Sequence, residues 1–101
     1  MPHFEMNLNI WYYLPDHLLA KLPLIYEQMD GWIGNNEEYN FPQWYGPMDV
    51  QEYINASIEP SGLHFEANLP EEKWLIWQQK FKHIATEVLG FEVGEPEDGF
   101  E

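Results

Sequence analysis

Two histidines and two glutamates have a spacing that could create a metal site. His3 and Glu5 stand two residues apart, and His64 and Glu66 repeat that spacing farther along the chain. Residues two apart in a strand point to the same face. If the two segments pair, their imidazole and carboxylate groups meet on one face and offer the donors that divalent metals bind. Such residues more often form a solvated polar sheet face, so we expect no metal site.

The sequence lacks the signatures of common catalytic centres. It has no cysteine, and its serines, Ser57 and Ser61, are not in a G-x-S-x-G elbow. It has no phosphate-binding glycine loop and no H-E-x-x-H zinc helix. Chance pairs among 18 acidic residues are unavoidable, but no apolar pocket is evident that would raise the pKa of one carboxyl. We therefore expect no catalytic residues and no cofactor. A small enzyme or ligand-binding domain that uses carboxylates and histidine is the second alternative.

Charge is the most unusual property of the sequence. Eighteen Asp and Glu face four Lys and no Arg, which gives a formal net charge of −14. This charge exceeds the roughly 2–8 units that a small domain needs for solubility. It repels nucleic acid and anionic lipid and attracts cationic surfaces, and the missing Arg disfavours phosphate binding. We expect a basic protein partner and no direct contact with nucleic acid or a membrane.

Residues 35–49 show neither helical nor strand periodicity but are rich in rings and acids. Aromatic residues are enriched at protein interfaces, and carboxylates beside them steer a basic partner. The rings could instead fold back as a lid over the sheet, an alternative that stays open for Trp32 and Phe41. We expect the rings of Tyr39, Trp44 and Tyr45 to be partly exposed. The predicted partner-binding residues here are Glu37, Glu38, Tyr39, Trp44, Tyr45 and Asp49.

A polar sheet face forms a second candidate surface. If the strands pair as supposed, Trp11, Tyr13 and Tyr53 share the face that the helices leave uncovered. Rings on an open face mark contact sites, so we add these three residues to the partner-binding set. A homodimer through this face is the alternative.

Five segments have clear periodicity. Residues 3–14 alternate as a strand, and residues 16–29 have a helical stripe that Pro23 should kink or split. Residues 50–69 predict a β-hairpin around "EPSG", and a long amphipathic helix runs from Pro70 to Gly90. The order is β-α-β-β-α, which predicts an α+β fold with a single antiparallel sheet and two helices on one face. If residues 91–93 add a strand, the plan is ferredoxin-like.

One domain accounts for the chain. We assign residues 1–94 to a single α+β domain and 95–101 to an acidic, flexible C-terminal tail. The sequence has no signal-peptide start, no apolar run of bilayer length and no cysteine. These features predict a cytoplasmic protein.

In its small size, its acidity and its lack of catalytic motifs, the chain resembles, in type, the acidic inhibitors that bacteria and phages make against nucleases. These are immunity proteins of toxin systems and anti-defence proteins that mimic nucleic acid. The sequence carries no motif of a particular family. The leading hypothesis is a non-catalytic protein that neutralises a basic partner such as a nuclease or toxin domain. The first alternative is a self-associating housekeeping or regulatory interaction module.

Overall fold

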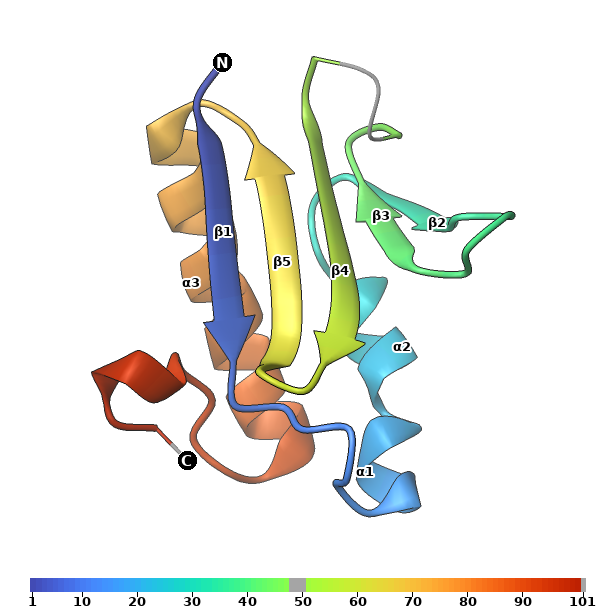
Figure 1. Cartoon of the computed structure of the whole chain (residues 1–101), viewed down its shortest axis with the longest axis vertical. Helices are drawn as coiled ribbons and strands as arrows, with labels where there is room; N and C mark the ends of the chain where they lie inside the picture. Colours follow the sequence, from blue (N-terminus) through green and yellow to red (C-terminus); the bar gives the residue numbers. More distant parts are fainter. Residues whose placement is uncertain (48–50, 101) are drawn as a thin grey trace.

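The computed structural model describes residues 1–47 and 51–100 and shows an α+β fold with one antiparallel sheet (Figure 1). The sheet has five strands in the order β1-β5-β4-β3-β2. The first strand of the chain, β1, pairs with the last strand of the chain, β5, and the long helix follows β5. The strands are β1 (His3–Leu8), β2 (Trp32–Asn35), β3 (Pro42–Trp44), β4 (Tyr53–Glu59) and β5 (Gly62–Asn68).

Helices cover one face of this sheet, as predicted (Figure 1). The first helical region is split into α1 (Asp16–Leu19) and α2 (Leu22–Tyr26). Of the kink or split expected at Pro23, the structure shows a split: Pro23 lies in the first turn of α2, where a missing N–H breaks no helical hydrogen bond. The long helix α3 (Glu71–Leu89) ends at Gly90, whose φ of 84° suits a glycine.

The predicted β-hairpin is confirmed as β4 and β5. Its turn follows Glu59, which is paired with Gly62. Alternation then directs Leu63, Phe65 and Ala67 towards the helices, where all three are buried.

One predicted boundary is wrong. β1 ends at Leu8 and does not continue to residue 14, because Asn9 bonds to the chain that follows α3. The Asn9 backbone N–H donates to the Gly94 carbonyl (3.0 Å), its side-chain Nδ2 donates to the Glu92 carbonyl (3.0 Å), and its Oδ1 accepts from Gly94 N–H (2.9 Å). Residues 91–93 form no strand, so the ferredoxin-like arrangement is not confirmed. The 3-10 helix η1 (Pro96–Asp98) follows, and the flexibility of this tail stays a prediction.

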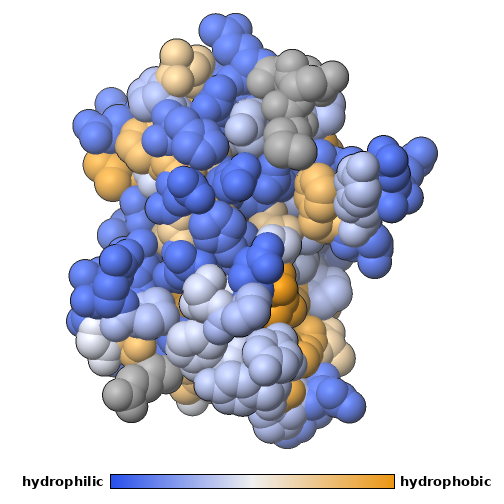
Figure 2. All heavy atoms as spheres, viewed as in Figure 1, coloured by the Kyte–Doolittle hydropathy of each residue, from blue (hydrophilic) through white to orange (hydrophobic). Residues whose placement is uncertain are grey.

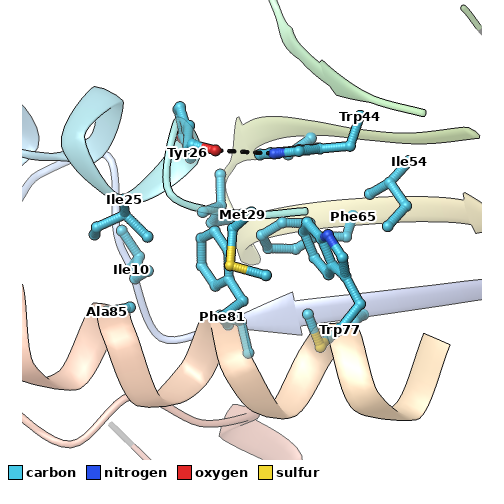
Figure 3. Packing of buried hydrophobic residues seen from close by; sticks show 14 of the residues in the cluster. Ile10, Ile25, Tyr26, Met29, Trp44, Ile54, Phe65, Trp77, Phe81 and Ala85 are labelled. Atoms are coloured by element: carbon cyan, nitrogen blue, oxygen red, sulfur yellow. Dashed lines mark hydrogen bonds between the residues drawn. The ribbon is translucent and has the colours of Figure 1, made fainter. Parts of the chain in front are cut away.

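Among the described residues of the buried core, aliphatic side chains surround six rings that pack on one another, five of which are labelled in Figure 3. Phe65 of β5 meets Phe81 of α3 with ring centroids 4.9 Å apart, and Trp44 of β3 meets Trp77 of α3 at 5.0 Å. Both pairs are edge-to-face, a favourable ring geometry. These contacts join one face of the sheet to α3.

Candidate functional site

The sheet face opposite the helices is polar, and we call it the open face. Because side chains alternate along a strand, the residues between the buried core positions of β1, β3, β4 and β5 belong to it. In the orientation of Figure 1 this face is in view, and Figure 2 shows that hydrophilic residues dominate it. Its residues are His3, Glu5, Asn7, Gln43, Tyr53, Asn55, Ser57, His64, Glu66 and Asn68.

Positive charge is concentrated away from the open face. Three of the four lysines lie on α3, and each pairs with a carboxylate. Among the described residues of the open face there is no lysine, and its only basic groups are two histidines. The face is therefore anionic. The lysine ion pairs of α3 are Lys73–Glu52 (2.6 Å), Lys80–Asp30 (3.2 Å) and Lys82–Glu95 (3.9 Å).

Glu5, His64 and Glu66 form a compact cluster on this face. One ligand atom of each lies within 4.8 Å of the others. His64 Nε2 is 3.1 Å from Glu5 Oε1, and His64 Nδ1 is 2.9 Å from Asn7 Oδ1. The amide oxygen of Asn7 can only accept a hydrogen bond, so Nδ1 carries a proton. The sequence spacing predicted that these groups share a face, but the role of Asn7 was missed, although it has the same strand alternation as Glu5.

The two histidines do not meet as the sequence suggested. His3 is opposite Asn68, whereas His64 is opposite Asn7. The Glu5–Glu66 pair separates these two rows. The register therefore selects one histidine and two glutamates for the cluster.

Part of the aromatic-rich stretch belongs to the sheet, because β2 and β3 form a hairpin that protrudes from the body (Figure 1). Glu37, Glu38 and Tyr39 are exposed at its tip, which confirms the expected exposure of Tyr39. Tyr39 is 69% exposed and stacks on Phe41 with centroids 6.3 Å apart. The Asn36 side-chain oxygen accepts from the N–H of Glu38 (2.9 Å) and of Tyr39 (2.7 Å), which shapes the turn.

The expected exposure of Trp44 is wrong. Its exposed fraction is 0%, because alternation in β3 directs it towards the helices while Gln43 takes the open face. Tyr45 is half-buried, as expected, and Lys73 Nζ lies 4.2 Å from its ring centroid. Burial raises the pKa of Tyr45. Asp49, which was also predicted to bind a partner, lies outside the described residues.

Trp11 and Tyr13 lie beyond the end of β1, so their predicted place on the sheet face is wrong. The two rings are parallel, with an angle of 1° and centroids 6.0 Å apart, and Tyr13 is 67% exposed. Tyr12 is exposed and packs edge-on against Tyr13. We call residues 11–13 the aromatic turn.

Tyr53 is on the open face but is buried. Burial, together with the nearby negative charge of Glu66, raises its pKa. The predicted partner-binding residues therefore do not form one patch: the described ones occupy the hairpin tip, the aromatic turn, the open face and the core side of β3.

No helix in the described ranges 1–47 and 51–100 is long and apolar enough to cross a membrane. Comparison with protein-family models, curated proteins and solved structures gave no match to the chain.

Proposed function

We propose that this chain is a non-catalytic protein that captures a basic protein partner in the cytoplasm. The observation that carries the proposal is the separation of charge. The lysines of α3 are paired with carboxylates, whereas the open face presents Glu5 and Glu66 with no lysine among its described residues. Such a face attracts a cationic surface and aligns it before contact.

Exposed rings outside the open face would supply contact energy. Tyr39 projects at the hairpin tip beside Glu37 and Glu38, and Tyr12 and Tyr13 are exposed in the aromatic turn. Tyrosine brings a large area to an interface and has few rotamers to freeze. Carboxylates would set the approach of the partner, and these rings would slow its release.

Nuclease and toxin domains are the partner class that we favour. A nuclease presents cationic groups where it binds phosphates, and carboxylates on this chain would occupy those positions. The protein would then act as an inhibitor, either as an immunity protein or as a nucleic-acid mimic. The net charge of −14 and the absence of arginine support binding to a protein and disfavour binding to nucleic acid.

Self-association is the second candidate, and one observation favours a particular route. β2 is an edge strand, and Ile33 on it is half exposed, which invites pairing with another edge. A symmetric dimer through the open face is less favourable, because it would bring two anionic surfaces together.

A pull-down from host lysate at low and at moderate salt tests the proposal. The wild type is compared with Glu5→Gln/Glu66→Gln and with a matched control, Glu71→Gln/Glu72→Gln, which removes equal charge from the first turn of α3. We expect one stoichiometric basic partner that the control retains at moderate salt and the open-face variant loses. Equal loss by both variants, or only a salt-labile mixture of cationic proteins, contradicts the proposal. A monomer–dimer transition by sedimentation would favour self-association.

A further inference from the structure

We propose that Glu5, His64 and Glu66 bind a divalent transition-metal ion on the open face. The three side chains come from the adjacent strands β1 and β5, and their ligand atoms lie within 4.8 Å of one another. This proposal does not depend on the proposed protein partner.

The orientation of His64 is fixed for such a role. Its Nδ1 donates to Asn7 Oδ1 (2.9 Å), and Asn7 Oδ1 also accepts from Ser61 Oγ (3.0 Å). Hydrogen bonding of one ring nitrogen is the usual way in which a protein orients a metal-binding histidine. The other nitrogen, Nε2, is thereby directed at Glu5 Oε1, 3.1 Å away. A lone pair and a carboxylate at this distance repel unless a proton or a cation lies between them.

The two carboxylates need more positive charge than one histidine supplies. Glu5 and Glu66 are direct cross-strand partners, and like charges in that relationship destabilise a sheet. Glu66 makes no hydrogen bond or ion pair with any side chain in the described part of the chain. A protonated His64 offsets one of the two negative charges, whereas a divalent ion offsets both.

The donor set indicates the class of ion. One imidazole nitrogen and two carboxylate oxygens suit Zn²⁺, Co²⁺ or Mn²⁺ better than Ca²⁺ or Mg²⁺, which prefer oxygen donors alone. Glu5 can turn towards the ion because its side chain is 59% exposed. Water would complete the coordination.

Titration of the untagged protein with Co²⁺ and with Zn²⁺ tests the site, followed by visible absorption and by calorimetry. We expect one equivalent to bind, with visible bands of nitrogen and oxygen coordination. His64→Gln should abolish these bands, and Asn7→Ala should weaken affinity by roughly 10-fold or more, as for other residues that orient a metal ligand. The matched control is His83→Gln, which removes an exposed histidine that pairs with Glu87 (3.2 Å) outside the cluster.

The proposal is overturned if His64→Gln binds Co²⁺ as the wild type does, or if only several weak equivalents bind that no variant affects. The second result would mean diffuse attraction to an acidic surface. Circular dichroism establishes that each variant is folded. If His64→Gln does not fold, Glu5→Gln gives the same test, because an exposed side chain is seldom needed for folding.

Discussion

The indole Nε1 of Trp44 donates a hydrogen bond of 3.0 Å to the backbone carbonyl of Tyr26 (Figure 3). The two rings also meet edge-to-face, with centroids 5.5 Å apart. The base of the β2–β3 hairpin is thus attached to α2, while its tip at Tyr39 is exposed. Trp44, at the base of the hairpin, therefore stabilises the fold, whereas Tyr39, at its tip, is exposed to solvent.

Trp44→Ala should lower the free energy of unfolding by about 3–5 kcal/mol, because it leaves a large cavity in the core. Trp44→Phe should cost less, about 1–3 kcal/mol, because it retains a ring but leaves a smaller cavity and removes one of the two hydrogen bonds to the Tyr26 carbonyl, which still accepts from Met29 N–H (3.2 Å). Urea denaturation measures both values. The exposed Tyr39→Ala is the control and should change stability by less than about 0.5 kcal/mol. Equal effects of Trp44→Ala and Tyr39→Ala would show that Trp44 is not a core residue.

Two glycines make a matched pair for a test of packing at the sheet. Gly62 has a φ of 117°, and a Cβ there would collide with the Leu8 carbonyl oxygen. Gly34 has a φ of 105° but open space around the same position. Gly34→Ala should cost about 1–3 kcal/mol from backbone strain alone, and Gly62→Ala should cost more because β1 must move. Thermal melts of the two variants provide the comparison, and similar melting temperatures would contradict the close approach of β1 to β5.

Elements with one clear apolar face could be predicted from the sequence. In β5, the alternation of apolar residues such as Leu63 and Phe65 indicates the buried face. In α3, apolar residues at steps of three and four indicate the buried side of the helix. The β2–β3 hairpin could not be predicted, because its strands are short and its register shifts between Trp32 and Gly34. Such a shift interrupts the alternation on which a strand prediction depends.

The candidate site was predictable only in part. Shared strand faces correctly grouped Glu5 with His64 and Glu66 once β1 and β5 were supposed to pair. The end of β1 depends on bonds from Asn9 to the chain around Gly94, and nothing local to either segment signals them. The aromatic turn was therefore placed on the wrong surface.

Glu95 predicts a pH dependence of stability. Burial raises its pKa above the ordinary 4.5; the positive charge of Lys82 opposes this shift, while a hydrogen bond with Asp98 and the charges of Asp98 and Glu97 add to it. Because the folded-state pKa is the higher one, the contribution of Glu95 is fully present below about pH 4.5 and is lost as pH rises through the raised value. Glu95→Gln should therefore gain melting temperature over the wild type near pH 7 and lose that advantage at pH 4. A constant difference across this range would contradict the raised pKa.

The hairpin tip predicts a kinetic effect on partner binding. Glu37→Gln/Glu38→Gln should slow association by about two- to tenfold at low salt and flatten its salt dependence, because exposed carboxylates act on the approach of a basic partner. Tyr39→Ala should instead speed dissociation, since an exposed ring contributes contact energy only in the complex. Surface plasmon resonance with the captured partner, across a range of salt, separates the two rates.

The control for this effect is Glu71→Gln/Glu72→Gln, which changes net charge equally at the N-terminal end of α3. If steering is local to the hairpin tip, this control should alter association much less than the tip variant, because the field of a surface charge decays over a Debye length of about 8–10 Å. Equal slowing by the two double variants would mean that net charge alone sets the rate. Unchanged association of the tip variant with the true partner would remove the hairpin tip from the proposed binding surface.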